Sequence, residues 1–366
     1  MTPAVTRVGI VGTGLVGGSV GLALRRAGIE VRGFDHDADR TARAVELGAL
    51  DAAVGSVAEA ATGADFVIVA VPVGAIASVV LDALDAGAAV VTDVGSVKEP
   101  VVIAVEAQRP DLASRYVGGH PMAGSEQDGL DGASADLFSG ATWVLTPTER
   151  TDPTAFAALQ QLLGRLGAEV SAVSPAEHDA LVAVVSHVPQ LAATTLMDVA
   201  ATRGTSHALL LRLAAGGFRD MTRIAAGHPG IWPDICVANR DAIVAALDDY
   251  VAALDGVRSM VAASDRAGLL DVLERARSAR RSLPTGFPDD VELSELHVPI
   301  ADRPGSLAEV TTLAGTLDVN IADIEIAHSV EGEGGVLVLL LAAADADTFV
   351  DALATRGYHA VRTTLP

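Results

Sequence analysis

A glycine-rich turn near the start of the chain has the spacing of nucleotide-binding turns. Gly12, Gly14 and Gly17 follow the strand-like run 8–11 and match the GxGxxG pattern. The first glycine permits a tight turn, the second lets a pyrophosphate approach the backbone, and the third permits close helix packing. Asp35 ends the next strand-like run, where a carboxylate can bind a ribose 2′-hydroxyl and would repel a 2′-phosphate. The pattern therefore predicts a dinucleotide site that prefers NAD to NADP.

Other residues at the ends of predicted strands are expected to complete this site, because ligands of parallel sheets bind at the carboxyl ends. The run 66–71 ends beside Pro72, and the segment DVGSVK occupies residues 93–98. Ser96 can therefore reach the nicotinamide or a substrate, although a serine there can also cap a helix. The predicted cofactor-binding residues are Gly12, Thr13, Gly14, Leu15, Val16, Gly17, Asp35, Val71 and Pro72.

Two further side chains can carry chemistry. Lys98 is the only lysine among 25 basic residues, and it is either a solvated surface residue or one kept for a specific hydrogen bond. His120 lies in the glycine-rich segment 118–126, which we expect to be a loop. A neutral imidazole is the usual acceptor of a hydroxyl proton near neutral pH, but a loop histidine can also serve only as a hydrogen-bonding group.

The elements that must position these residues change in type along the chain. Short apolar runs alternate with helical patterns to about residue 145, which is typical of a parallel sheet covered on both faces. This predicts an α/β Rossmann domain over residues 1–152. Residues 153–283 have an almost wholly helical pattern and are predicted to form an all-α domain for substrate binding and dimerisation. Within it, Pro189 should kink a helix expected over 176–202.

The last part of the chain has a third pattern. Residues 282–290 include three Pro or Gly residues, as is typical of a linker. After them, residues 291–366 follow the order strand, helix, strand, strand, helix, strand. This is the α+β ferredoxin-like pattern.

Composition restricts the classes of protein that this chain can be. Half of its 366 residues are hydrophobic and its formal net charge is −22, so nucleic acids and anionic membrane surfaces are not expected partners. The longest apolar runs are interrupted, for example by His187 and Pro189, and we expect no membrane span and no signal peptide. Cys236 is the only cysteine, so a reducing, cytoplasmic setting fits. No metal site is predicted.

The order of the motifs resembles one family, the bacterial prephenate dehydrogenases with the related arogenate and cyclohexadienyl dehydrogenases. The segments that carry the resemblance are the GxGLxG turn, DVGSVK, GGHPMAGSE, SHVPQ at 186–190, and GGFRDMTRIA at 216–225 followed by Trp232. The resemblance implies NAD-dependent oxidative decarboxylation of prephenate to 4-hydroxyphenylpyruvate in tyrosine biosynthesis. Aromatisation of the ring would drive that reaction.

The resemblance also implies roles for individual residues. His120 corresponds to the catalytic histidine that accepts the hydrogen bond of the substrate 4-hydroxyl. Ser96 corresponds to a serine that bonds the same hydroxyl and helps to orient the histidine, and Arg223 to an arginine that grips a carboxylate. Residues that line or gate the pocket by resemblance are Glu126, His187 and Trp232. Without it, His187 would be a core histidine and Trp232 a packing residue.

Two positions depart from the pattern of some members and leave the substrate open. Gln190 stands where a second histidine can follow, and Arg219 where a lysine can occur. Both are expected to touch the substrate side chain, the end at which prephenate and arogenate differ. Arogenate dehydrogenase, giving tyrosine directly, therefore remains the alternative enzyme.

The C-terminal part resembles an ACT domain, and the resemblance implies an amino-acid effector, which we expect to be tyrosine. Its ligand loop corresponds to Asp302, Pro304, Gly305 and Ser306. Two other interpretations remain: a module used only for oligomerisation of the expected homodimer, and a non-catalytic NAD-bound sensor. A 3-hydroxyacid dehydrogenase would rely on a lysine in its helical domain, and residues 153–283 contain none.

Overall fold

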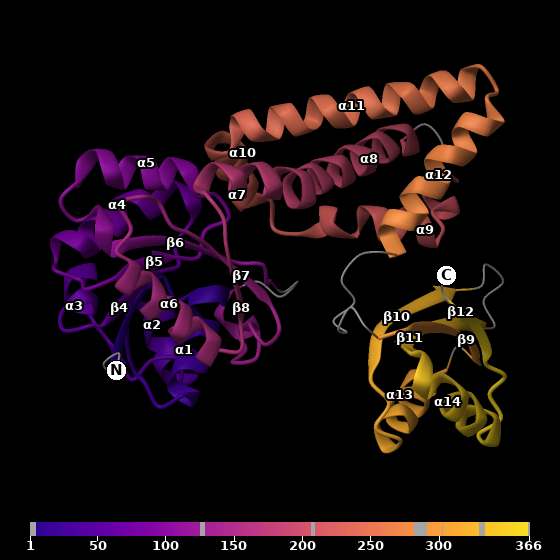
Figure 1. Cartoon of the computed structure of the whole chain (residues 1–366), viewed down its shortest axis with the longest axis horizontal. Coiled ribbons are helices and arrows are strands. Elements are labelled where there is room, and N and C mark those ends of the chain that lie inside the picture. The colour runs from indigo at the N-terminus through magenta and orange to yellow at the C-terminus, as the bar shows by residue number, and fades with distance from the viewer. Residues whose placement is uncertain are drawn as a thin grey trace. The chain divides into compact units, whose positions relative to one another are not determined.

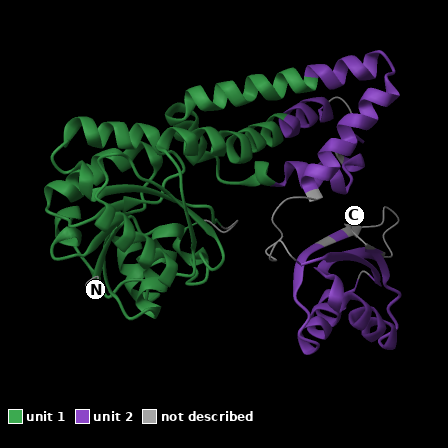
Figure 2. Cartoon of the chain, viewed as in Figure 1, with its two compact units in different colours: residues 1–195, 224–254 green, residues 196–223, 255–366 purple. Residues whose placement is uncertain are grey.

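The chain forms two compact units (Figure 2), and each is described by itself. The computed structural model describes residues 5–124, 129–205, 209–281, 291–301, 303–328 and 334–364. The first unit comprises residues 1–195 and 224–254, and the second comprises residues 196–223 and 255–366.

The first unit is built on an eight-stranded sheet in the order β3-β2-β1-β4-β5-β6-β7-β8. The first six strands of the chain, β1 to β6, are parallel to one another. Strand β7 runs antiparallel to β6, and β8 runs parallel to β7. The strands are β1 Arg7–Val11, β2 Glu30–Phe34, β3 Ala52–Ala53, β4 Phe66–Val69, β5 Val91–Asp93, β6 Tyr116–Pro121, β7 Thr142–Thr146 and β8 Glu169–Ala172. The order reverses at β1, between β2 and β4, and such switch points are where open α/β sheets bind ligands. The predicted Rossmann sheet is therefore confirmed.

Helices cover both faces of this sheet (Figure 1). Ile10 of β1 packs in one core with α1 and α6, and Val69 of β4 packs in the other with α3, α4 and α5. The helices are α1 Leu15–Arg26, α2 Ala38–Glu46, α3 Val57–Ala61, α4 Val73–Asp85, α5 Glu99–Gln108 and α6 Pro153–Arg165. Burial on both faces explains the continuous apolar runs of the central strands.

One strand lies beyond the boundary at residue 152 that the sequence predicts. Strand β8, Glu169–Ala172, pairs with β7 and extends the sheet to residue 172. The segment after residue 155 is therefore less helical than its pattern indicates. Most of β8 is exposed at the sheet edge, so it lacks the apolar run that identifies the central strands.

The helical segment after β8 changes its winding before Pro189. Helix α7, Pro175–Val182, continues as a π-helical turn, Ala183–His187, and then as α8, Val188–Gly204. A proline within a helix has no N–H to donate and its ring clashes with the carbonyl four residues earlier. The change of winding lies directly before Pro189, and the helix continues beyond it to Gly204. The kink expected at Pro189 stays a prediction. By length and composition alone Pro175–Gly204 is long and apolar enough to span a membrane, which the sequence did not lead us to expect; 28% of its most apolar window is buried within the described residues.

Four further helices follow among the described residues up to residue 281. They are α9 Gly216–Thr222, α10 Trp232–Ala238, α11 Arg240–Ala262 and α12 Arg266–Arg281, with 3₁₀ turns at Leu211–Leu213, Arg223–Ala226 and Pro229–Ile231. Helices α10 and α11 are separated at Asn239.

The C-terminal part forms a separate four-stranded antiparallel sheet in the order β10-β11-β9-β12. Its elements are β9 Leu293–Ala301, α13 Ser306–Thr316, β10 Ile321–His328, β11 Gly334–Ala342, α14 Ala343–Thr355 and β12 Val361–Thr364. Alternate residues such as Leu296, Leu337 and Leu339 pack with Phe349 and Leu353 of α14 in one core. The predicted βαββαβ order is confirmed.

Candidate active site

The glycine-rich turn between β1 and α1 gives each glycine a different environment. Gly12 has a φ of +92°, and a Cβ there would lie 2.3 Å from the Ala70 carbonyl oxygen. A Cβ on Gly17 would lie 1.9 Å from the Gly12 carbonyl oxygen, because α1 packs closely against the turn. A Cβ on Gly14 would meet no atom within 4 Å. This open backbone at the start of α1 suits the approach of a pyrophosphate.

A cavity of about 720 Å³ lies beside this turn. It is lined by the predicted residues Gly12, Gly14, Leu15, Val16, Asp35, Val71, Pro72 and Ser96, together with others that include His36, Arg40, Ile231 and Ile235. Thr13 and Gly17 are not in its lining; Thr13 is fully buried. A mostly apolar cavity with a few polar groups and an open glycine backbone fits a dinucleotide.

Asp35 is held at the end of β2 by several donors. Its carboxylate accepts from the Thr13 N–H at 2.8 Å, the Thr13 hydroxyl at 3.2 Å and the Asp37 N–H at 3.0 Å. Burial by itself would raise the pKa of Asp35, but these backbone donors and the charges of Arg40 and His36 outweigh it and lower the pKa. Asp35 is therefore an anion fixed in position where a ribose hydroxyl can donate to it.

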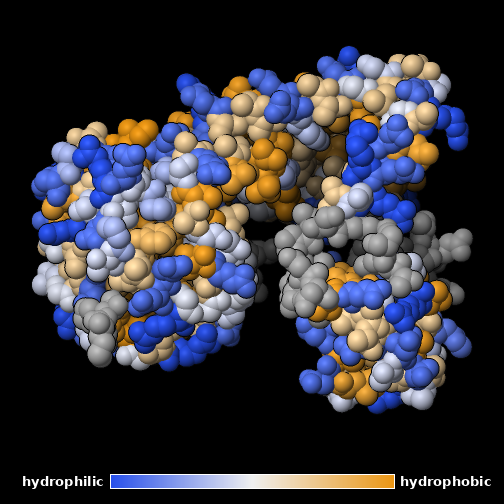
Figure 3. Space-filling view, viewed as in Figure 1, coloured by the Kyte–Doolittle hydropathy of each residue, from blue (hydrophilic) through white to orange (hydrophobic). Residues whose placement is uncertain are grey.

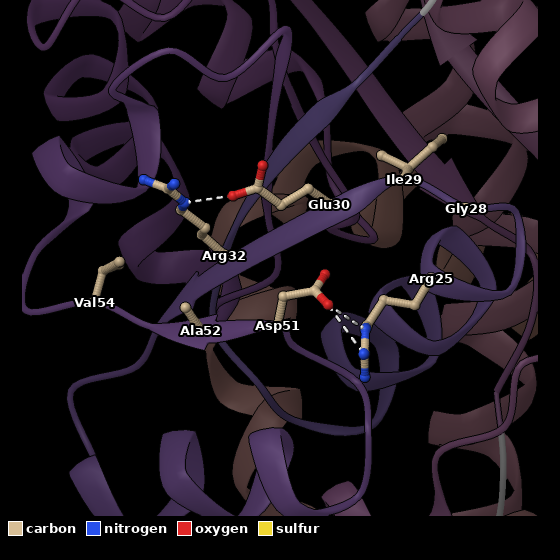
Figure 4. A pocket seen from close by; sticks show the side chains of 8 residues that line it. All are labelled: Arg25, Gly28, Ile29, Glu30, Arg32, Asp51, Ala52 and Val54. Carbon is tan, nitrogen blue, oxygen red and sulfur yellow. Dashed lines mark hydrogen bonds and ion pairs between the residues drawn. The ribbon is translucent and has the colours of Figure 1, made fainter.

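A second hollow, of about 610 Å³, lies at the opposite, amino end of β2 (Figure 4). Its charged side chains are paired with each other: Arg25 bonds Asp51, and Arg32 bonds Glu30. None of the predicted site residues lines it.

Lys98 is fully buried and makes specific hydrogen bonds, so the surface interpretation is wrong. Its Nζ forms an ion pair with Asp93 at the end of β5 and donates to the Gly119 carbonyl at 2.8 Å. Asp93 also accepts from the Tyr116 hydroxyl at 2.6 Å and the Gly95 N–H at 2.8 Å. Lys98 thus ties the end of β5 to β6.

His120 lies in strand β6, and the expectation of a flexible loop is wrong. It is opposite Val144 in the pairing with β7. The two glycines before it serve close packing: a Cβ on Gly119 would lie 2.7 Å from the Asp93 carbonyl oxygen, and one on Gly118 would lie 2.5 Å from Thr146 Oγ1. The glycines that suggested flexibility therefore allow a tightly paired strand.

His120 is anchored through a second histidine. Its Nδ1 lies 2.9 Å from His178 Nε2, and His178 Nδ1 lies 2.7 Å from Asp179 Oδ1. Asp179 also accepts from the backbone N–H groups of Lys98 and Glu99, each at 2.8 Å. Because Nδ1 of His120 is occupied, Nε2 is the atom that can take a proton from a substrate.

The surroundings keep His120 neutral. Burial, and then the positive charge of Lys98 and the neighbouring His178 and His187, hold the pKa of His120 well below its usual value. Similarly, burial raises the pKa of Tyr116 well above its usual value, with Asp93 as the next cause. A neutral imidazole at neutral pH is what a general base requires.

His187 ends the π-helical turn and is buried. Its Nδ1 lies 3.2 Å from Asn239 Nδ2, which also donates to the Asp179 carbonyl at 2.9 Å. The Trp232 ring lies edge-on at 6.1 Å between ring centroids. Among the described residues, no group bonds His187 Nε2, although that atom is buried.

The remaining predicted residues are distributed over other elements. Gln190 is buried in α8, with its Nε2 3.5 Å from Thr194 Oγ1. Arg219 in α9 and Arg223 at the start of the next 3₁₀ turn have exposed side chains and belong to the second unit. Glu126 and Asp302 lie outside the described residues.

The predicted effector loop lies at the start of α13 in the second unit. Gly305 caps this helix with a φ of +95°, after the exposed Pro304. Ser306 is buried, and its hydroxyl has no partner within the described residues.

The sheet order and the glycine-rich turn at its switch point define a dinucleotide-binding protein of the Rossmann class. Models of two families match the chain: "Prephenate dehydrogenase, nucleotide-binding domain" over residues 20–172, and "Prephenate dehydrogenase, dimerization domain" over residues 174–275. The chain therefore belongs to the prephenate dehydrogenase family, as its motifs indicated.

Individual proteins of known name are similar to most of the chain. Prephenate dehydrogenase of Bacillus subtilis (strain 168) is 34% identical over 336 residues, covering 90% of each chain. Cyclohexadienyl dehydrogenase of Zymomonas mobilis is 32% identical over 286 residues, which is 76% of this chain and 96% of that protein. The crystal structure of prephenate dehydrogenase from A. aeolicus with hydroxyphenyl propionate and NAD+ has a TM-score of 0.72 and 31% identity, covering 78% of this chain and all of that one. These matches support NAD as the cofactor.

The sequence did not predict three residues of the hydrogen-bond network that anchors His120 and His187: His178, Asp179 and Asn239. They follow no motif spacing, and the pattern around them indicates only helix. The one available signal was a pair of ionisable residues, His178 and Asp179, within an otherwise apolar helical run.

Proposed function

We propose that this protein is an NAD-dependent dehydrogenase that oxidises prephenate with loss of CO2 to give 4-hydroxyphenylpyruvate, in the tyrosine pathway and in the cytoplasm. The observation that carries the proposal is His120, a neutral imidazole anchored through Nδ1 on β6. Strand β6 pairs with β5, and the residues Val94 and Ser96 that follow β5 line the nucleotide cavity. When bound, NAD supplies the acceptor for the hydride that leaves C4 of the ring. Membership of the family supports the substrate class.

The residues of the chain then have separate tasks. His120 Nε2 accepts the proton of the 4-hydroxyl while the hydride departs, because an unprotonated imidazole has the free lone pair that a general base needs. Ser96, which lines the cavity, bonds the same hydroxyl. Arg223 grips a substrate carboxylate, with Arg219 and Gln190 near the substrate side chain, while Glu126, His187 and Trp232 line or gate the pocket. These roles follow from the motifs and are part of the proposal.

The test is a reduction assay on the full-length protein. Purified enzyme is supplied with prephenate or arogenate, each with NAD or NADP, and reduced cofactor is followed by absorbance. We expect turnover with prephenate and NAD. No turnover with either substrate, under conditions in which NAD binds, would reject the enzyme in favour of a non-catalytic NAD sensor.

Arogenate is the second candidate substrate. The similarity to a cyclohexadienyl dehydrogenase supports it, and Gln190, at a position where some members have histidine, leaves the choice between the two substrates open. If arogenate is the better substrate by kcat/KM, the product is tyrosine itself. The same assay decides between the two substrates.

We also propose that the chain works as a homodimer through its helical segment. The match to a dimerization domain over residues 174–275 supports this. Helices α7 and α10 and the first part of α11 carry exposed apolar side chains, and orange atoms gather over the helical segment in Figure 3. The exposed apolar side chains include Leu181, Val237, Val244 and Val251, with Val185 of the π turn. Exposed apolar side chains that gather on one segment are typical of an interface. Sedimentation measurements test the prediction, and a monomer at micromolar concentration would contradict it.

Finally, we propose that the C-terminal sheet is an ACT-type regulatory domain that binds tyrosine at Asp302, Pro304, Gly305 and Ser306. The ferredoxin-like order, the glycine with φ +95° and the unpartnered Ser306 hydroxyl support it. The experiment is tyrosine inhibition of the Gly305→Val variant. Gly357→Val is the matched control, because Gly357 also has a positive φ of 84° and open space around it.

The two glycine variants carry similar backbone strain, so a difference between them reports on the ligand loop. We expect Gly305→Val to lose inhibition by tyrosine and to keep its basal activity, with Gly357→Val unchanged in both. Equal, purely competitive inhibition of all three proteins would mean that tyrosine acts at the catalytic pocket.

A further inference from the structure

His120 and His187 share one anchor, Asp179, within the first unit. The side chain of Asp179 reaches His120 through His178, with successive distances of 2.7 and 2.9 Å. Its main-chain carbonyl reaches His187 through Asn239, with distances of 2.9 and 3.2 Å. Asp179 is itself fixed, because the backbone N–H groups of Lys98 and Glu99 bond its two carboxylate oxygens.

The His120 arm has a defined direction. An ionised carboxylate only accepts hydrogen bonds, so His178 Nδ1 carries the proton. In a singly protonated ring, His178 Nε2 is then an acceptor and takes the hydrogen of His120 Nδ1. The tautomer of His120 that results has its lone pair on Nε2.

The His187 arm has the opposite result. A main-chain carbonyl only accepts, so the amide of Asn239 must turn its NH2 group towards the Asp179 oxygen. The same NH2 group faces His187 Nδ1, which must therefore accept. The proton of His187 is then on Nε2, the buried atom that no described residue bonds. A buried donor without an acceptor is unfavourable unless a ligand or a water molecule occupies the place next to it.

We propose that Asp179, His178 and Asn239 are positioning residues that set opposite tautomers on the two histidines. They make His120 Nε2 an acceptor for the substrate hydroxyl and His187 Nε2–H a donor to a substrate oxygen. The part concerning substrate rests on the proposed function. In the proton transfer, the substrate O–H bond breaks and a bond forms at His120 Nε2. The proton on His120 Nδ1 moves to His178 Nε2, where the positive charge lies next to the Asp179 carboxylate.

Tautomers can be observed directly, without turnover. Two-bond 1H–15N correlation spectra of full-length enzyme labelled with 15N-histidine show which ring nitrogen of each of the nine histidines carries a proton. Signals are assigned with His120→Gln and His187→Gln variants. We expect an unprotonated Nε2 on His120 and a protonated Nε2 on His187. The same tautomer on both rings would overturn the proposal.

Variants of Asn239 test the second arm. Asn239→Asp offers only acceptors, so the proton of His187 should move to Nδ1 while His120 is unchanged. The matched control is Asn320→Asp, because Asn320 is the only other asparagine and is exposed. Loss of a hydrogen bond to a charged substrate group should raise KM about 10- to 100-fold, with a smaller change in kcat. An unchanged His187 tautomer in Asn239→Asp would refute this arm.

Variants of the other two residues test the first arm through kcat. Asp179→Asn can present an NH2 group to His178, and His178 and His120 would then both adopt the opposite tautomer. A wrong tautomer of this kind lowers kcat by up to about 10⁴-fold in a serine protease triad, and we expect a loss of up to that size here. His178→Leu should lower kcat at least about 100-fold. His178→Gln, whose amide oxygen can accept from His120 Nδ1, should keep kcat within about 10-fold of wild type.

The possible failures are distinguishable. If His120→Asn keeps its kcat but the spectra show the expected tautomers, the proposed base is wrong and the network is right. If His178→Gln and His178→Leu lose activity equally while both fold, His178 acts by packing and the tautomer argument for His120 fails.

Discussion

Replacing Lys98 with methionine tests whether the buried ion pair with Asp93 supports the site. Methionine keeps an unbranched apolar chain but removes the amine. Asp93 then retains only uncharged donors, the Tyr116 hydroxyl at 2.6 Å and the Gly95 N–H at 2.8 Å. The Gly119 carbonyl, 2.8 Å from Nζ, loses its donor. Both side chains of the pair are 0% exposed, so bulk water cannot solvate the Asp93 carboxylate once the amine is gone.

Removing one partner of a buried pair destabilises a protein by about 3–5 kcal/mol, because the other charge remains uncompensated. For a unit of this size we therefore expect Tm to fall by roughly 6–20 °C. The chain supplies a probe for that unit alone: its two tryptophans, Trp143 and Trp232, both belong to the first unit. Unfolding is followed by tryptophan fluorescence during heating and in urea.

The double variant Asp93→Asn with Lys98→Met is the control. It removes both charges and keeps an amide that can bond Tyr116 and Gly95, so most of the lost stability should return. A Tm of Lys98→Met within about 2 °C of wild type would refute the reasoning. So would a double variant that is no more stable than Lys98→Met, because the loss would then come from packing.

Three further predictions concern the reaction. His120→Asn should lower kcat by about 10²–10⁴-fold with NAD affinity unchanged, as measured by steady-state kinetics and a binding titration; wild-type kcat would exclude His120 as the base. Arg223→Ala should raise KM for the substrate strongly, because truncating one partner of a charged hydrogen-bonded pair weakens binding by about 2–5 kcal/mol. An unchanged KM would mean that Arg219 binds the substrate carboxylate instead. Wild-type enzyme should have a higher kcat/KM with NAD than with NADP, and Asp35→Ser should reduce the ratio of these two values. Equal kcat/KM of the wild type with both cofactors would contradict the role of Asp35 in selecting NAD.

The parts of the fold that could be predicted have strong local signals. The central strands are buried on both faces and read as continuous apolar runs, and the turn at Gly12 needs a positive φ of 92° that glycine supplies. The C-terminal βαββαβ order followed from alternating strands with turn residues between them. These features depend on neighbours in sequence, so the sequence displays them.

The parts that could not be predicted depend on distant contacts. Gly118 and Gly119 suggest a loop by composition, but they allow β6 to approach Asp93 and Thr146 closely. Lys98 has no local feature that separates a buried lysine from a surface one, and its partner Gly119 is 21 residues away. His178 meets His120 across 58 residues. Only the paired strands and the packed helix bring these groups together.

The pH dependence of kcat/KM tests the electrostatic part of the site. Burial, then Lys98, His178 and His187, lower the pKa of His120, so the base stays unprotonated below the usual histidine range. We expect the acidic limb of kcat/KM to lie well below pH 6.5, the ordinary pKa of histidine, and activity to fall only when His120 gains a proton. In Lys98→Met one positive charge next to His120 is gone, so that limb should move to higher pH, measured below the unfolding temperature of the variant. The lowered pKa of His120 also makes the stability of the fold depend on pH. Below pH 6.5 the unfolded chain binds a proton at His120 that the folded chain does not bind. The free energy of unfolding therefore decreases as the pH falls. An acidic limb that is the same in wild type and Lys98→Met would mean that Lys98 positions β6 without acting on His120 through its charge.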